Sequence, residues 1–384
     1  MKPEHFTKSA AGQCIKTPQG YWAFVPHPLP PKIDYPTSLA RLLADASKAL
    51  GELAGVGRLL PNPHLLIAPY IRREALLSSR IEGTQATLDD LFLFEAVPSR
   101  GGPEPDLREL VNYIRAMEYG LKRLEELPIS CRLVREIHKY VVEGVRGSHG
   151  TPGEFRTKQN WIGPPGCTLN EATFVPPPVQ EMKDALSEWE KYLHSGPSEP
   201  LLVQCALMHY QFEAMHPFVD GNGRVGRLLI TFFMCERGYL PQPLLYLSAY
   251  FERNQGEYYD RLLRVSTVGD WHGWLEFFLQ GVVTQAKDAV NWSTELIELH
   301  ESYRQRLATR RVPRGTHEIV DALFVSPYVT ITAASKRWGI SYPTACSAIE
   351  TLVHLGIVEE VTGRRRDRVY CAKELLNILS RPEE

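Results

Sequence analysis

The sequence predicts a mainly α-helical protein with one β-hairpin and a small C-terminal domain. Apolar residues recur at helical spacing from Thr37 to Leu91 and again from Asp106 to about Gln285. The proline- and glycine-rich stretch from Gly150 to Pro178 interrupts the second region, with two short β-prone runs around Pro164-Pro-Gly166. At 384 residues, the chain is long enough for two or three domains.

We expect four segments along the chain. An N-terminal region covers residues 1–105 and a helical core covers residues 106–285. A linker helix then covers residues 286–315, and the C-terminal domain covers residues 316–384. Clusters of proline and glycine at residues 99–105 and 313–315 mark the end of the first segment and the start of the last, because such clusters favour turns and loops.

The N-terminal region starts with a proline-rich stretch that we expect to be irregular up to about residue 37. Within it, Tyr21–Val25 is a predicted short strand and Pro26–Pro36 a predicted extended connector. The helical pattern that follows is interrupted at Pro61-Asn-Pro63, and residues 99–105 are a predicted loop.

The core contains a polar loop between two apolar segments. Leu201–Met215 precedes the loop and Leu228–Gly238 follows it, and both are predicted helices. The loop reads His216-Pro-Phe-Val-Asp-Gly-Asn-Gly-Arg-Val-Gly-Arg227, so it leads into the N-terminus of the second helix. A helix N-terminus presents backbone N–H groups and a partial positive charge, which favour a phosphate.

The residue types in this loop suit phosphate chemistry. His216 is the one group there whose unperturbed pKa lies near neutrality, so it is the predicted general base. Asp220 is a hard carboxylate, which suits Mg²⁺ better than zinc. The predicted phosphate contacts are the backbone at Gly221 and Gly223, the amide of Asn222, and the guanidinium forks of Arg224 and Arg227.

Other interpretations of the loop fit less well. Gly221-Asn-Gly223-Arg-Val-Gly226 also matches the dinucleotide fingerprint G-x-G-x-x-G, but that fingerprint follows a strand and here a helix precedes it. No G-x-x-x-x-G-K-[ST] phosphate loop occurs in the sequence. A structural loop with capping Asp and Asn residues would not need the histidine and both arginines.

The pattern H-P-F-x-D-G-N-G-R-x-x-R resembles the active-site signature of the Fic (filamentation induced by cAMP) domain. The resemblance implies a bacterial-type protein adenylyltransferase, which moves AMP from ATP to a hydroxyl side chain of a target protein. It implies that His216 deprotonates that hydroxyl and that Asp220 holds Mg²⁺. The whole segment from Gly221 to Arg227, with Val225 and Gly226, would bind ATP. Gly223 favours AMP transfer, because the kinase-like relatives carry lysine at that place.

A second resemblance lies upstream, at Ser78-Ser-Arg-Ile-Glu82-Gly83, which is similar to the family's inhibitory motif [S/T]-x-x-x-E-[G/N]. Ser78 and Glu82 are four residues apart and would share a helix face, and Gly83 would cap that helix. The resemblance implies that the helix packs over the nucleotide site and that Glu82 pairs with Arg227, which keeps Arg227 from the γ-phosphate. The alternative is an ordinary exposed helix glutamate.

The predicted hairpin resembles the family's flap, which holds the target peptide by strand-like pairing. The alternative is an ordinary surface hairpin. Relatives contact the adenine where this chain has Tyr258 and Tyr259, although aromatic residues there can equally belong to the core. The flap residues that the resemblance places beside the nucleotide are Asn160, Trp161, Ile162 and Gly163.

The C-terminal domain resembles a winged helix-turn-helix. Its lysines and arginines number eight against nine aspartates and glutamates, and the second helix of the motif has neither lysine nor arginine. Because phosphate contacts dominate DNA affinity, DNA is not the favoured partner, and we expect protein recognition or dimerisation. The predicted helices are 319–324, 330–338 and 341–352, and the predicted wing strands are 356–361 and 368–371.

Composition indicates a soluble globular protein, with 43% hydrophobic residues, 23% charged residues and a net charge of -2. The seven scattered cysteines form no C-x-x-C pair, so we expect reduced and mostly buried thiols. His209, on an apolar helix, is predicted to be a hydrogen-bonded core residue rather than a zinc ligand. Without an apolar leader or an 18-residue apolar run, we expect a cytoplasmic protein and no membrane insertion.

Two alternative functions stay open. In some relatives the inhibitory glutamate positions a water that removes AMP from a modified target, so such an enzyme would need Glu82. The chain could otherwise be a nucleotide-sensing transcriptional regulator that binds DNA through its C-terminal domain. Intact His216 and Asp220 argue against a purely sensory core, because binding alone needs neither base nor metal. Modification of the protein by itself and a homodimer are both compatible with the sequence.

Overall fold

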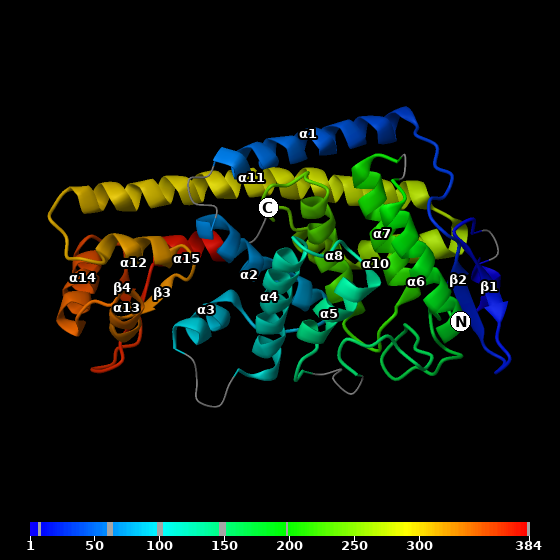
Figure 1. Cartoon of the computed structure of the whole chain (residues 1–384), viewed down its shortest axis with the longest axis horizontal. Coiled ribbons are helices and arrows are strands. Elements are labelled where there is room, and N and C mark those ends of the chain that lie inside the picture. The colour runs from blue at the N-terminus through cyan, green and yellow to red at the C-terminus, as the bar shows by residue number, and fades with distance from the viewer. Residues whose placement is uncertain (7–8, 60–63, 98–102, 146–150, 197–198, 382–384) are drawn as a thin grey trace. The chain divides into compact units, whose positions relative to one another are not determined.

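The computed structural model describes residues 1–6, 9–59, 64–97, 103–145, 151–196 and 199–381. The break predicted at Pro61–Pro63, most of the loop predicted at 99–105, and Gly150 lie outside these residues. The described chain is mainly helical, as predicted (Figure 1). It divides into two compact units: unit 1 is Met1–Ala54 with Asn112–Ala286, and unit 2 is Gly55–Val111 with Lys287–Glu384.

Unit 1 is built around helices α7 (Leu201–Met215) and α8 (Asn222–Glu236), drawn in green in Figure 1. Every residue of α7 is buried except Leu201 and Glu213. A helix that is apolar on all sides belongs inside a core, which explains its central place. Around it lie α4 (Pro105–Arg123), α5 (Cys131–Val141), α6 (Val179–His194), α9 (Ser248–Arg253) and α10 (Gln255–Val268).

Three helices contribute residues to both units, namely α4 and the two long helices α1 (Thr37–Leu59) and α11 (Trp271–Ala308). The separate linker helix predicted at 286–315 is therefore wrong, because α11 runs unbroken through residue 286. The helix also continues through Gly281. The ring of Tyr250 packs against this glycine, and an added Cβ would lie 2.8 Å from that ring. The predicted stop at Pro313-Arg-Gly315 does lie beyond the end of α11.

The first 37 residues are more regular than predicted. After a short 3₁₀ helix, η1 (Pro3–Phe6), strand β1 (Gly12–Lys16) pairs antiparallel with β2 (Trp22–Pro26). The prediction found β2 and missed β1, whose residues Gly-Gln-Cys-Ile-Lys show no clear apolar alternation. The ring of Phe24 in β2 packs between Phe6 and Phe174, so the sheet is tied to the flap.

The flap forms a hairpin with a single antiparallel bridge instead of two strands. Ile162 N–H donates to Phe174 O at 2.8 Å, and Phe174 N–H donates back to Ile162 O at 3.0 Å. Proline has no N–H to donate, so the prolines at 164, 165 and 176–178 prevent the ladder from extending.

Unit 2 combines α2 (His64–Ile81) and α3 (Leu88–Ala96) with the C-terminal part of α11 and the last elements of the chain. We call residues 316–381 the C-terminal module. Its strands form a three-stranded antiparallel sheet in the order β3-β5-β4. Helices and wing strands lie near their predicted places, whereas β3 and α15 were not predicted. The elements are α12 (Thr316–Leu323), β3 (Tyr328–Thr330), α13 (Ile331–Trp338), α14 (Tyr342–His354), β4 (Glu359–Glu360), β5 (Val369–Cys371) and α15 (Lys373–Ser380).

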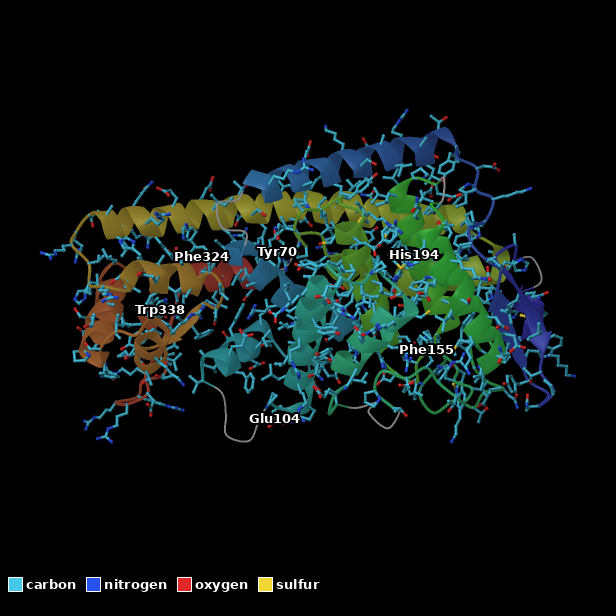
Figure 2. All side chains as sticks on the ribbon, in the orientation of Figure 1. Tyr70, Glu104, Phe155, His194, Phe324 and Trp338 are labelled. Atoms are coloured by element: carbon cyan, nitrogen blue, oxygen red, sulfur yellow. The ribbon has the colours of Figure 1, made fainter. Side chains whose placement is uncertain are left out.

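Helix α2 is fixed inside unit 2 by aromatic and polar contacts with α11. The hydroxyl of Tyr70 donates to Ala289 O at 2.7 Å, and the Tyr70 ring meets Trp292 edge-on at 4.5 Å (Figure 2 labels Tyr70). The guanidinium of Arg73 lies over the same Trp292 ring, which in turn donates from Nε1 to Ile378 O of α15 at 2.9 Å. These contacts join α2, α11 and α15.

The cysteines and the apolar helices were the subject of two predictions from composition. All seven cysteines are free, as predicted, but only Cys205 and Cys371 are buried, so the expectation of mostly buried thiols is wrong. In the part of the chain that the structure describes, no helix is long and apolar enough to cross a membrane.

Candidate active site

The polar loop between α7 and α8 turns through two residues in the left-handed backbone region. His216 follows the last turn of α7 at φ 45° and ψ 61°, with its N–H on Phe212 O at 3.1 Å. Gly221 precedes α8 at φ 78°, and an added Cβ there would lie 3.0 Å from Val142. For a non-glycine residue such as His216, this conformation costs roughly 1–2 kcal/mol. The surrounding contacts must therefore hold it.

Two flap residues hold the start of the loop. Arg156 donates from Nε to His216 O at 3.0 Å and from its backbone N–H to Pro217 O at 2.9 Å. Asn160 donates from Nδ2 to His216 O at 3.2 Å and to Phe218 O at 2.8 Å. The flap thus fixes three consecutive carbonyls of the loop, and these bonds offset the cost of the His216 conformation. The Asn160 amide spans the loop through these two bonds, and its predicted place beside the nucleotide stays a prediction.

Arg156 was not predicted as a site residue. Its side chain is only 2% exposed, and it also donates from Nη2 to Pro177 O at 2.6 Å. Burial lowers its pKa to about 10, so the guanidinium is still charged at neutral pH. In the sequence, Arg156 ends the segment Gly153-Glu-Phe-Arg156 at the start of the flap. Nothing in that segment indicates that the Arg156 side chain is buried.

His138 of α5 holds the other end of the loop. Its Nδ1 accepts from Gly153 N–H at 2.9 Å, which leaves the proton on Nε2 to be donated to Asp220 O at 3.1 Å. The imidazole stacks on Phe218 at 3.7 Å, and Phe218 also contacts the ring of Phe155, labelled in Figure 2. His138 is a second residue that the sequence did not reveal, since an isolated helix histidine carries no motif.

We expect His138 to stay neutral well below the pH at which an ordinary histidine gains its proton. Burial lowers its pKa to about 4; the bond to the Asp220 carbonyl opposes this shift, and the charge of Arg224 adds to it. Since the unfolded chain takes up this proton near pH 6.5, His138 lowers the stability of the folded state as pH falls from about 6.5 to 4. Above pH 6.5 it has no such effect.

Imidazole NMR signals recorded from pH 7 to pH 4.5 measure this directly. The His138 signals should keep their neutral shifts at pH 5, where the imidazole of an unstructured peptide is mostly charged. Assignment comes from the His138→Gln variant. A His138 midpoint near 6.5 would mean that the buried contacts with Gly153 and Asp220 do not persist in solution.

Asn222 closes the loop on itself. Its Oδ1 accepts from Phe218 N–H at 2.9 Å and its Nδ2 donates to Phe218 O at 3.0 Å. The side chain is 2% exposed. The amide therefore acts like a strand partner for Phe218, and its predicted contact with a phosphoryl oxygen stays a prediction.

Positive charge gathers where α8 begins. Arg224 and Arg227 are 3% and 2% exposed, and the Arg224 guanidinium lies 3.8 Å from Asp220 Oδ1. The backbone N–H groups of Asn222 and Gly223 fall in the first turn of α8, where a helix offers no intrahelical acceptor. Two buried guanidinium groups beside a helix N-terminus favour an anion.

Gly226 and His209 belong to the contact between α7 and α8. An added Cβ at Gly226 would lie 2.2 Å from Glu213 Oε1, so a larger residue there would displace the Glu213 carboxylate. His209 is fully buried between Gly226 O at 3.1 Å and the Tyr258 hydroxyl at 2.8 Å, which confirms it as a hydrogen-bonded core histidine. The predicted ATP contact of Gly226 has no direct support in this geometry.

The remaining predicted contacts differ in their exposure. Tyr258 is 1% exposed and engaged with His209, whereas Tyr259 is 46% exposed on α10. Of the two tyrosines predicted on the adenine side, Tyr259 has the accessible ring. The flap residues Trp161, Ile162 and Gly163 are exposed, and Val225 is fully buried in α8.

The upstream motif forms the end of α2 in unit 2. The last helical residue is Ile81, and Thr84 N–H bonds Ser79 O at 3.2 Å while Gly83 N–H bonds Arg80 O at 2.9 Å. This pair of bonds with Gly83 at φ 95° is the Schellman ending, so the predicted glycine cap is confirmed. Glu82 lies in the turn and is exposed, while Ser78 is fully buried. Glu82 follows the last helical residue, so the shared helix face stays a prediction.

The fold and the loop define a helical domain with a polar turn between two central helices, and comparisons with known proteins agree on the family. The Fic/DOC family N-terminal model matches residues 40–122, and the Fic/DOC family model matches residues 128–234. Curated proteins named "Protein adenylyltransferase Fic" are similar: that of Drosophila sechellia is 26% identical over 216 residues, and that of Drosophila virilis is 28% identical over 189 residues. The alignments cover 53% and 48% of this chain, but only 40% and 35% of the relatives.

Solved structures show the same fold. A Fic family protein from Desulfovibrio desulfuricans has a TM-score of 0.56 at 18% identity, covering 90% of this chain and 98% of that one. A Fic domain containing signaling protein from Bacteroides thetaiotaomicron has a TM-score of 0.50 at 16% identity, covering 68% and 97%. This chain is a Fic domain protein.

Proposed function

We propose that this chain is a protein adenylyltransferase that uses ATP to place AMP on a hydroxyl side chain of a target protein. The observation that carries the proposal is the loop itself, where a half-buried His216 opens a short turn that leads into α8, whose first two turns hold two buried arginines. The name of the curated relatives supports it. Because the chain spans about two fifths of their length, the target and the partners belong to this proposal.

The reaction needs one proton transfer and one displacement. The target oxygen forms a bond to the α-phosphorus of ATP, and the bond from that phosphorus to the β-bridging oxygen breaks, so that diphosphate leaves. The hydroxyl proton passes to the His216 imidazole. Arg224, Arg227 and the N–H groups that open α8 lie where they can offset the charge on the phosphates.

Asp220 fits the metal that such a reaction uses. Its carboxylate side chain is 44% exposed, and its Oδ1 accepts from Gly221 N–H at 2.6 Å. Mg²⁺ commonly takes one or two protein carboxylates and fills its other positions with phosphate oxygens and water. Within the described residues there is no group of three or more His, Cys, Asp or Glu that could hold a metal ion. Bound Mg²⁺ would neutralise phosphate charge, and Asp220 would hold it.

Glu82 is the proposed restraint on this activity. The support is the match of Ser78 to Gly83 with the inhibitory motif, together with its place in a structured turn at the end of α2. Glu82 is exposed, so a buried charge does not explain the proposed inhibition. Glu82 would act instead by keeping Arg227 from binding the γ-phosphate of ATP.

The test is the Glu82→Gly variant, incubated with Mg²⁺ and α-labelled ATP alone and in cell lysate. We expect protein-bound label to rise by about 5- to 150-fold, the range typical of coupling between sites. Glu126→Gly is the matched control, because Glu126 is also an exposed glutamate in a turn that follows a helix, and it should leave labelling unchanged.

The same reagents separate the alternatives. If Glu82→Gly labels no better than wild type, Glu82 is not the restraint. If wild type removes label from a premodified protein and Glu82→Gly does not, the chain is an AMP-removing enzyme. Operator binding is not proposed, since α14 carries neither lysine nor arginine.

A further inference from the structure

Unit 2 contains a cavity between helices α2 and α3 on one side and the C-terminal module on the other. Its volume is about 230 Å³. The module supplies an apolar wall, which includes Leu323 of α12, Val329 of β3, and Ala334 and Trp338 of α13. Trp338 is labelled in Figure 2. None of these residues belongs to the loop of His216.

Polar groups line the same cavity. Arg72 of α2 donates from Nε to both oxygens of Glu95 at 3.1 and 2.9 Å, and from Nη1 to Ala68 O at 2.9 Å. Among the described residues, the Nη2 of Arg72 makes no hydrogen bond, although the side chain is only 11% exposed. The Oγ of Ser326 also lines the cavity, and within the described chain it is buried without a hydrogen-bond partner.

The charges of the lining leave one excess positive charge. Arg72 is neutralised by Glu95, whereas Arg337 lies over the Trp338 ring at 5.5 Å, and no acidic side chain of the described chain pairs with it. One excess cation suits a monoanion, and a dianion such as phosphate would lack a second one. The apolar wall favours a ligand that also has an apolar part.

We propose that this cavity binds a small organic monocarboxylate, with its apolar part against Leu323 and Trp338 and its carboxylate toward Arg337, Arg72 and Ser326. The cavity lies below the roughly 300–1,000 Å³ of sites for drug-sized ligands, so the ligand is smaller than those. Simple packing voids are apolar and dry, whereas this one has an unused guanidinium N–H group and a buried hydroxyl without a partner.

Binding at this site acts on α2, because α2 forms one wall through Arg72. The same helix ends ten residues later at the turn that carries Glu82. A ligand that bridges Arg72 and the C-terminal module holds α2 against that module. If the proposed restraint by Glu82 is right, the ligand then acts on AMP transfer. The binding itself does not depend on that activity.

The experiment is a calorimetric titration of the full chain with phenylacetate and with hexanoate. We expect one saturable site with a dissociation constant of about 1 mM or tighter, which is ordinary for ligands of this size. Phenylacetamide, the neutral analogue of phenylacetate, should bind at least tenfold more weakly. Arg337→Gln should weaken phenylacetate binding about tenfold or more, as expected for the loss of a charged hydrogen bond. Lys336→Gln is the matched control, since Lys336 is exposed on the same helix outside the cavity.

Further variants exclude a site elsewhere and a purely local effect. Ala322→Leu places extra volume at the cavity wall and should abolish binding. If the melting curve shows that this variant is misfolded, Arg337→Gln alone tests the site. Arg337 is exposed, so its replacement leaves the core intact. Hydrogen exchange should slow in α2 when phenylacetate is bound. Equal binding of phenylacetamide, no saturable binding, or undiminished binding by Arg337→Gln each overturns the proposed site. Unchanged exchange in α2 overturns the link to that helix.

Discussion

Replacing His216 with alanine is expected to lower the proposed AMP transfer by about 10²–10⁴-fold, the range that a positioned general base contributes. The target hydroxyl has no other base in this loop, because Asp220 lies beside Arg224 and is assigned to the metal. The measurement is label transfer from α-labelled ATP in the Glu82→Gly background, where the rate is highest. ATP binding, measured separately by calorimetry, should be preserved.

The control distinguishes lost chemistry from lost structure. His194→Ala changes a histidine outside the loop that bonds Ile129 O at 2.9 Å, and it should retain most of the activity. If His216→Ala keeps more than a tenth of the rate while it folds normally, another group takes the proton. The assignment of His216 as the base would then be abandoned.

Replacing Arg156 with methionine has the second largest expected effect, on both stability and rate. The variant leaves the carbonyl of Pro177 and part of the bonding of His216 O without a donor, and each such loss costs about 1–3 kcal/mol. His216 then loses part of what holds its left-handed backbone. A shift of 1–2 kcal/mol in that equilibrium corresponds to roughly a 5–30-fold loss of rate.

Two measurements separate these effects. The melting temperature reports the stability loss, and the rate at a temperature well below melting reports the positioning of His216. Arg132→Met is the matched control, because Arg132 is 70% exposed, and it should change neither. Arg156→Lys keeps the charge without the planar fork and should fall between wild type and methionine. A methionine variant that melts lower with a normal rate would show that Arg156 stabilises the fold without positioning His216.

The sequence was sufficient for the elements whose chemistry lies in one short stretch. The loop of His216, the helices around it and the glycine cap at Gly83 follow from local periodicity and turn chemistry. The roles of Arg156 and His138 could not be predicted, because both depend on contacts with residues far away in the sequence. His138 reaches Asp220, which is 82 positions away, and Arg156 reaches His216 at 60. No local pattern marks such a pair.

The errors in the fold have the same origin. The linker helix was predicted from its charged surface, yet α11 continues because nothing between Trp271 and Ala308 forces an end. The pairing of β1 with β2 and the reduction of the flap to one bridge depend on which backbone groups find partners. Tyr258 was assigned to a ligand from its place along the chain, while its hydroxyl is used by His209 in the core. Whether a tyrosine is available to a ligand depends on its burial, which its position in the sequence does not reveal.

The division of the chain has a consequence for the order in which its parts are made. Every residue of unit 1, with the loop of His216, has been synthesised once the ribosome passes Ala286. Helix α2 has been synthesised earlier still, but Trp292 and the carbonyls of Ala289 and Ile378 that fix it belong to the last 98 residues, Lys287–Glu384. At bacterial to eukaryotic elongation rates, those residues take roughly 5–20 s to add. In each newborn molecule, unit 1 with the loop of His216 is therefore complete before unit 2, which carries the proposed restraint.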